Sequence, residues 1–142
     1  MAATDTHPLI WALSGDPQLS AAAKSVFTEA DAGQAIVLIS PIVTVEVIYL
    51  SEKRRISVEL VDDLLAKVFA PGLSYRLAEL DAAVINALRQ IPRNLITDMP
   101  DRIIAATAKA NSCALITRNG AITTSGLVPV IWQADFQSPI RP

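Results

Sequence analysis

The stretch that decides the fold is Ala35-Ile36-Val37-Leu38-Ile39-Ser40-Pro41. Its first five residues are an uninterrupted apolar run, which is typical of a strand buried on both faces of a parallel sheet. Ser40 then supplies a helix N-cap, and Pro41 suits the first helical position, where no backbone N–H is needed. The chain therefore passes directly from a buried strand into a helix, which we expect to run to about Arg54.

The segment before this run predicts a first strand and two helices. Ala2-Ala3-Thr4 is the candidate strand, and its low apolar content predicts marginal pairing. A short helix is expected around Leu9 to Leu13. A longer amphipathic helix follows, because apolar residues recur at helical spacing from Leu19 to Ala30 and Gly33 stands where such a helix would stop.

The segment after the run continues the alternation of helices and strands. Helices are predicted from about 61 to 70, where Pro71-Gly72 follows, from 81 to 89 and from 98 to 111; strands are predicted over 73–77, 114–117 and 128–132. Pro129 places the last strand at an edge of the sheet. Residues 1–142 therefore predict one α/β domain, a three-layer α/β/α arrangement with a central, largely parallel sheet.

Composition excludes several classes of protein. With 142 residues and 51% hydrophobic residues, the chain is long and apolar enough to fold as one domain. Its net charge of −2 gives no global attraction to nucleic acid or anionic lipid. One cysteine and one histidine allow neither an internal disulfide nor a zinc site. We see no signal peptide and no apolar stretch that spans a bilayer, and we expect a cytoplasmic protein without membrane contact.

Polar residues follow the predicted strands at the edge where ligands bind in open parallel sheets. Asp5 follows the first strand, Glu46 lies on the second turn after the apolar run, Asp101 lies in the first turn of its helix, and Asn119 follows the strand over 114–117. Oxygen ligands without Cys or His select a hard cation, Mg²⁺ or Mn²⁺. Such a cation suits the hydrolysis of phosphodiester bonds.

Each acidic residue also has a structural interpretation. Asp5 also suits the N-cap of the short helix that follows it. Glu46, on a helix that is apolar nearly all round, also suits an ion pair with an arginine or a face that reaches water. Asp98 caps the helix that contains Asp101, which leaves Asp101 freer for another role. Capping does not explain why three acids follow three different elements at one edge of the sheet, and this convergence favours the cation.

Four segments resemble PIN-domain endoribonucleases, and within them the VapC-type toxins of toxin–antitoxin pairs. In the family's order, these are Asp5-Thr6-His7-Pro8-Leu9-Ile10-Trp11-Ala12-Leu13, Ile39-Ser40 to Glu46 with Leu50, Asp98-Met99-Pro100-Asp101-Arg102-Ile103-Ile104-Ala105-Ala106-Thr107-Ala108, and Leu115-Ile116-Thr117-Arg118-Asn119 with Ile122.

The resemblance implies an Mg²⁺- or Mn²⁺-dependent ribonuclease of a type II toxin–antitoxin pair, with Asp5, Glu46 and Asp101 as metal-binding and catalytic residues. It also implies RNA as the substrate, a homodimer, and a small antitoxin whose C-terminal segment covers the groove. The family's fourth acidic position is Asn119 here, which offers a carbonyl oxygen without charge. Asn119 motivates the alternative of a catalytically weak or inactive PIN-like binding module that acts through protein–protein contacts.

Several neighbouring residues are accessory candidates. Asp98 adds a carboxylate, and Thr117 suits either a hydrogen bond to metal-bound water or the end of its strand. Arg102 and Arg118 are candidates for RNA phosphate contacts or for orienting carboxylates, with Arg102 equally suited to a structural ion pair. Trp11 and Trp132 are expected in the core or at an interface rather than as a base-stacking platform.

Overall fold

The computed structural model describes residues 1–70 and 74–133, and its centre is a five-stranded parallel sheet. The strand order is β3-β2-β1-β4-β5. The strands are β1 (Ala2–Thr4), β2 (Val37–Ile39), β3 (Tyr75–Leu77), β4 (Ala114–Ile116) and β5 (Val130–Ile131). In register, Ala3 lies opposite Leu38 of β2 on one side and Leu115 of β4 on the other.

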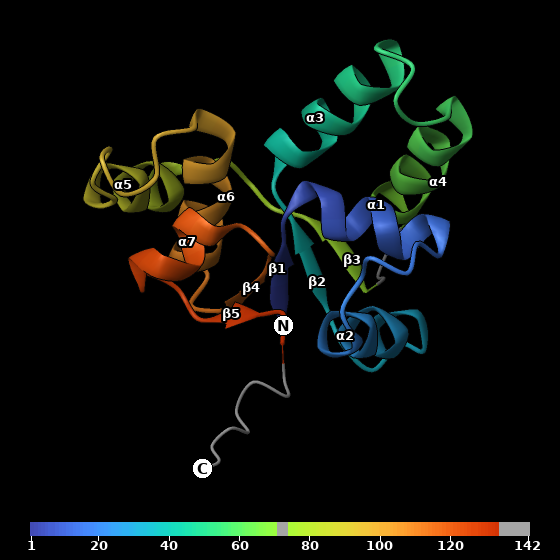
Figure 1. Cartoon of the computed structure of the whole chain (residues 1–142), viewed down its shortest axis with the longest axis horizontal. Helices are drawn as coiled ribbons and strands as arrows, with labels where there is room; N and C mark the ends of the chain where they lie inside the picture. The colour runs from blue at the N-terminus through green and yellow to red at the C-terminus, as the bar shows by residue number, and fades with distance from the viewer. Residues whose placement is uncertain (71–73, 134–142) are drawn as a thin grey trace.

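Seven helices in the described residues enclose the sheet on both faces. They are α1 (Thr6–Ser14), α2 (Ala21–Asp31), α3 (Pro41–Glu52), α4 (Val58–Phe69), α5 (Ala82–Gln90), α6 (Met99–Ala110) and α7 (Gly120–Ser125). Figure 1 shows α1 to α4 on one side of the strands and α5 to α7 on the other. The predicted three-layer α/β/α fold with a parallel sheet is confirmed.

The apolar run Ala35-Ile36-Val37-Leu38-Ile39 contains β2, and the residues on either side of this run fix the local structure. All three residues of β2 are buried, and Gly33 before it takes the left-handed φ of 77° that ends the preceding helix segment. Ser40 caps α3 by accepting a hydrogen bond from the Ile42 amide, and Pro41 begins the helix. Together with the fully buried Leu115 and Ile116 of β4, β2 forms the middle of the hydrophobic core.

The structure corrects the expected marginal pairing of the first strand. β1 is the central strand, hydrogen-bonded to β2 and β4, with Ala2 and Ala3 both buried. Small side chains suit this position, because α6 packs directly against β1. α7 was not predicted at all, and the last strand is limited to Val130 and Ile131 at the edge. Of the predicted strand over 73–77, Leu73 lies outside the described residues.

The topology fixes where a ligand site lies. From β1 the chain proceeds to β2 and β3 on one side, whereas β4 and β5 add on the other side. The strand order therefore reverses between β1 and β4, and in open parallel sheets ligands bind beyond the carboxyl ends of strands at such a point. Asp5 directly follows β1, and Thr117 directly follows β4.

Candidate functional site

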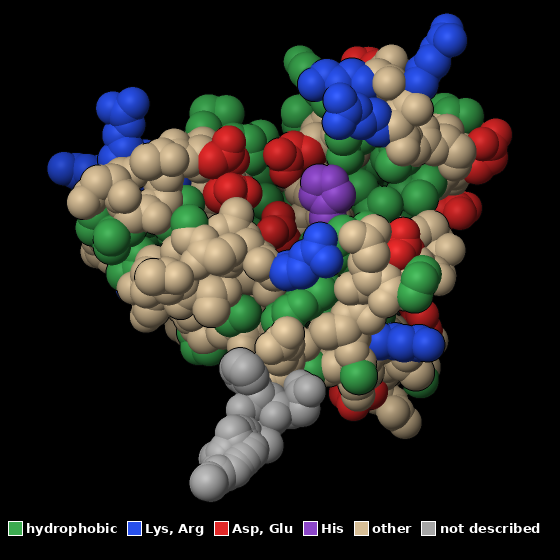
Figure 2. Space-filling view, in the orientation of Figure 1, with side chains coloured by type: hydrophobic (Ala, Val, Ile, Leu, Met, Phe, Trp, Pro, Cys, Tyr) green, Lys and Arg blue, Asp and Glu red, His purple; other side chains and the backbone are tan. Residues whose placement is uncertain are grey.

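A pocket of about 350 Å³ opens at this reversal point, within the size range of small-ligand sites. Its walls come from α1, α3, α6 and the segment after β4. They include all three predicted acidic ligands, and the lining residues are Asp5, Thr6, His7, Pro8, Trp11, Glu46, Asp101, Arg118 and Asn119. Figure 2 shows acidic side chains gathered with the histidine in the hollow between the two groups of helices.

Asp5 is the N-cap of α1, one of the two interpretations that the sequence left open, and its carboxylate also lines the pocket. As the N-cap of α1, its Oδ1 accepts a hydrogen bond from the Thr6 amide at 2.8 Å. Its Oδ2 accepts from the hydroxyl of the fully buried Thr117 at 2.7 Å. The two hydrogen bonds fix the carboxylate at the pocket, and each oxygen retains a further lone pair for another partner.

Glu46 enters the pocket from α3 and is half-buried. It accepts a hydrogen bond from the Thr6 hydroxyl. Burial raises the pKa of Glu46, the hydrogen bond from Thr6 lowers it, and the charges of Asp5 and Asp98 raise it again. The ion pair with an arginine considered from the sequence is absent among the described residues, and the charge of His7, which lowers the pKa of Glu46, is the smallest of the influences on it.

Asp101 is the most perturbed carboxyl of the pocket. Burial, followed by the charges of Asp5, Asp98 and Glu46, raises the pKa of Asp101 from its ordinary 3.8 to about 7. Asp98 lies at the N-cap of α6, as predicted, where its Oδ2 accepts from the Asp101 amide at 3.2 Å. Four carboxylates therefore lie close enough to repel one another.

Asn119 is used differently from the sequence expectation. Its carbonyl oxygen accepts a hydrogen bond from the Ile122 amide at 3.0 Å and so caps α7. Its amide nitrogen donates to Oδ2 of Asp101, also at 3.0 Å. The side chain thus points a donor into the pocket, while the oxygen that the sequence analysis offered to a cation is already engaged in the helix cap.

The donor set fits a hard divalent cation in chemistry, but the carboxylates are not arranged around one point. In residues 1–70 and 74–133, no group of three or more His, Cys, Asp and Glu side chains has a geometry that would hold a metal ion as it stands. Thr6, Thr117 and Asn119 each hold one of the three carboxylates by a hydrogen bond. Small side-chain rotations that exchange these donors for a cation would relieve the repulsion among the acids.

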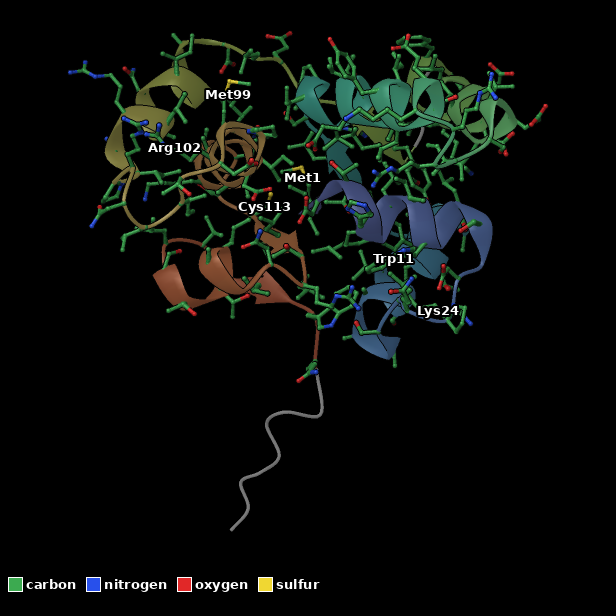
Figure 3. The ribbon with its side chains drawn as sticks, turned by 45° about the horizontal axis from the view of Figure 1, so that its top comes forward. Met1, Trp11, Lys24, Met99, Arg102 and Cys113 are labelled. Carbon is green, nitrogen blue, oxygen red and sulfur yellow. The ribbon has the colours of Figure 1, made fainter. Side chains whose placement is uncertain are left out.

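The two arginine candidates lie in different places. The Arg102 guanidinium donates two hydrogen bonds to the carbonyl oxygens of Leu88 and Ile91, at 3.1 and 2.9 Å. Figure 3 shows Arg102 beside α5, apart from Trp11 on α1. These contacts favour a structural role for Arg102, through backbone carbonyls rather than the expected ion pair. Arg118, in contrast, lines the pocket.

The sequence analysis did not identify Thr6 as a site residue. Thr6 is buried and holds both Asp5, through its amide, and Glu46, through its hydroxyl. Its position directly after the first acid was the available signal. His7 is exposed and lines the pocket, with its ring centroid 5.9 Å from that of Trp11. Trp11 is in the core, as predicted.

Three solved structures share the fold of this chain. VapBC2 from Rickettsia felis, bound to a promoter DNA fragment, aligns with a TM-score of 0.68 at 16% identity, covering 93% of this chain and 98% of that one. A toxin–antitoxin complex from Klebsiella pneumoniae gives 0.57 at 24% identity, covering 84% and 87%. FitAcB from Neisseria gonorrhoeae gives 0.59 at 20% identity, covering 92% and 96%.

Sequence comparison assigns the family. No curated protein matches the chain. No helix of the described residues is long and apolar enough to cross a bilayer. The family model of the PIN domain matches residues 2–123, from the central strand β1 into α7, and so includes every acidic residue of the pocket. The chain belongs to the PIN domain family.

Proposed function

We propose that the chain is a Mg²⁺- or Mn²⁺-dependent endoribonuclease and the toxin of a type II toxin–antitoxin pair. The observation that carries this proposal is the convergence of Asp5, Glu46 and Asp101 in one pocket at the reversal point of the sheet, where burial and the charges of Asp5, Asp98 and Glu46 raise the pKa of Asp101 to about 7. Carboxylates gathered at the cost of mutual repulsion are typical of functional sites. PIN domains are typically nucleases that use a divalent metal, and this pocket has the chemistry for one.

Asp5, Glu46 and Asp101 are the residues that would hold the cation. When bound, it would polarise the phosphodiester group and promote the ionisation of water. Thr117 and Thr6 orient the carboxylates of Asp5 and Glu46, and Asn119 orients that of Asp101. A supporting shell of this kind fixes ligand geometry, and its loss commonly lowers metal affinity or activity.

The test combines metal binding with RNA cleavage. Mn²⁺ should stabilise the wild type by mass action, by about 2.7 kcal/mol at a concentration 100 times the dissociation constant. Asp101→Asn and Glu46→Gln should lose this stabilisation together with Mn²⁺-dependent cleavage of single-stranded RNA, whereas Asp62→Asn, an exposed aspartate of α4, should keep both. A folded Asp101→Asn variant that cleaves as fast as the wild type would refute the assignment.

Exposed apolar residues on α3 support the proposed protein partners. The sequence of this helix is apolar nearly all round, and Val45, Ile48 and Tyr49 on it are exposed, Tyr49 to 58%. Such a surface suits an antitoxin or a second copy of the chain. Light scattering of the chain alone should give the mass of a homodimer, and Tyr49→Lys should weaken the self-association or the antitoxin complex that uses this surface.

Asn119 favours one second candidate, a binding module without catalysis. Its carbonyl oxygen caps α7 and its amide nitrogen faces Asp101, so it gives the pocket a hydrogen-bond donor in place of a fourth charge. A chain that binds Mn²⁺ only above millimolar concentration and cleaves no RNA, while still binding its antitoxin, would have this function.

A further inference from the structure

Arg118 has an unusual environment at the rim of the acidic pocket. Its guanidinium carbon lies 4.5 Å from the ring centroid of Trp11 and 6.0 Å from that of Trp132. The two indole rings lie 6.0 Å apart and are inclined at 55°. An arginine over an aromatic face is held by the attraction between its charge and the ring quadrupole. Trp11 is buried, so this support is part of the core.

The carboxylates of the same pocket do not engage this guanidinium. Arg118 lines the pocket with Asp5, Glu46 and Asp101, yet within residues 1–70 and 74–133 it forms no ion pair and no hydrogen bond. A guanidinium close to carboxylates normally forms a bidentate pair, because its donors match the two oxygens. Here the indole rings hold the cation apart from the acids, and its N–H donors stay available.

The position of Arg118 also connects two cavities. A second pocket, of about 460 Å³, lies between α7 and β5 and includes Arg118, Thr117, Thr123, Thr124 and Trp132. Arg118 and the Thr117 segment thus separate the acidic pocket from a neighbour that offers hydroxyl groups. An RNA strand that leaves the acidic pocket over Arg118 would meet this otherwise uncharged surface. The hydroxyls of Thr117 and Thr123 already donate to Asp5 and to the Asn119 carbonyl, so Arg118 supplies the charged donors for a phosphate there.

We propose that Arg118 is a phosphate subsite for single-stranded RNA, adjacent to the scissile phosphodiester, with Trp11 and Trp132 as its positioning residues. The proposal deepens the proposed function and rests on it for the identity of the ligand. Arginine suits this task, because its planar donors bind two phosphate oxygens at once. The aromatic support keeps the cation from neutralising the metal-binding acids.

The two tryptophans make the subsite directly observable. They are the only tryptophans in the sequence, so intrinsic fluorescence reports on the rings that hold Arg118. We would titrate the full chain with a mixed-sequence single-stranded oligoribonucleotide in EDTA, where the proposed nuclease does not cleave, at several salt concentrations. Arg118→Gln, Arg118→Lys and Trp132→Leu would be compared with Arg93→Gln, which removes the same charge from an exposed loop.

The expected result is a fluorescence change on RNA binding in the wild type and about tenfold weaker binding in Arg118→Gln. The plot of log affinity against log salt should be shallower by about 0.7, the slope of one phosphate contact on a single strand. Arg118→Lys should retain the salt slope with reduced affinity, and Trp132→Leu should weaken binding without changing that slope. Arg93→Gln should match the wild type.

Three results would overturn the subsite. They are an unchanged affinity and slope in Arg118→Gln, an equal loss in Arg93→Gln, and stronger competition by a poly-glutamate peptide than by RNA, which would indicate a carboxylate-binding surface. If Arg118→Gln fails to fold, Arg118→Lys decides by its affinity: reduced affinity supports the subsite, and an affinity equal to that of the wild type overturns it. The two proposals fail separately: Arg118-dependent binding without any Mn²⁺-dependent cleavage refutes only the nuclease, and cleavage with an unchanged KM in Arg118→Gln refutes only the subsite.

Discussion

Replacing Asp101 by asparagine should stabilise the protein in the absence of divalent cations. At most surface positions, replacing an aspartate by the similarly shaped asparagine changes the free energy of unfolding little. The structural cause is the pKa of Asp101, which burial and the charges of Asp5, Asp98 and Glu46 raise from 3.8 to about 7. A carboxyl whose pKa is higher in the folded than in the unfolded state destabilises the fold when it ionises.

The sign and the pH range follow from these two values. Below pH 4 the carboxyl is protonated in both states, so the wild type carries no penalty. Stability is lost as the pH rises towards 7, and the full penalty is present by about pH 8. The advantage of Asp101→Asn should therefore be absent at pH 4 and largest at pH 8.

The magnitude comes from the size of the shift. About three pKa units correspond to a ceiling of about 4 kcal/mol. The group is only half-buried and its repulsion is screened by solvent, which reduces the penalty to about 1–2 kcal/mol. Asparagine also loses a favourable charge in the first turn of α6, worth about 0.3–1 kcal/mol. We expect a net gain of about 1 kcal/mol at pH 8 in EDTA.

Urea unfolding of the wild type and Asp101→Asn between pH 4 and pH 8 would measure this difference, with Asp62→Asn on exposed α4 as the control for charge. The control should differ little from the wild type across the range. A free-energy difference between Asp101→Asn and the wild type that stays the same at pH 4 and pH 8 would refute the argument that these acids repel one another.

Three further changes test the surrounding structure. Thr117→Val should lower the free energy of unfolding by about 1–3 kcal/mol, measured in urea. The substitution removes the hydrogen bond to Asp5 and the hydroxyl oxygen that accepts from the backbone N–H of Asn119. Arg102→Ala should cost a similar amount, because the Ile91 carbonyl loses its hydrogen bond and the Leu88 carbonyl keeps only that from the Ile91 backbone amide. Mn²⁺ stabilisation should persist in this variant, and a loss of that stabilisation would place Arg102 in the site. Asn119→Asp keeps a good N-cap but adds charge beside Asp101, so melting at pH 8 should show lower stability in EDTA and a larger Mn²⁺ shift.

The elements that the sequence predicted well are those whose causes are local. The run that became β2 is apolar throughout, and the Ser40-Pro41 pair that follows it is a strong helix start. The start of α6 was predicted for the same reason, since Asp98 is its N-cap. Strand ends were sufficient to place Asp5 and Glu46 at one edge, because topology alone places the carboxyl ends of parallel strands there. Asp101 joins them because it lies at the start of α6, the helix that leads back into β4.

The features that could not be predicted from the sequence depend on contacts between residues that are distant in the chain. β1 is nearly featureless as Ala2-Ala3-Thr4, and its central position follows from small side chains that let α6 pack closely. Arg102 donates to two backbone carbonyls, and because every residue has a backbone carbonyl, the sequence does not indicate which ones it contacts. Only tertiary contacts decide between the alternatives that a charged residue type leaves open.

Asn119 shows why a list of site residues is not yet a site. Its side-chain amide has one oxygen acceptor and two N–H donors, and from the sequence we considered the oxygen as a ligand for a cation. In the structure, the carbonyl oxygen accepts a hydrogen bond from the Ile122 backbone amide at the start of α7, and the side-chain nitrogen faces Asp101. A cation that approaches Asp101 must therefore compete with a hydrogen bond as well as recruit the other carboxylates. Metal affinity in this chain should for that reason respond more to Asn119 than to any residue outside the acidic cluster.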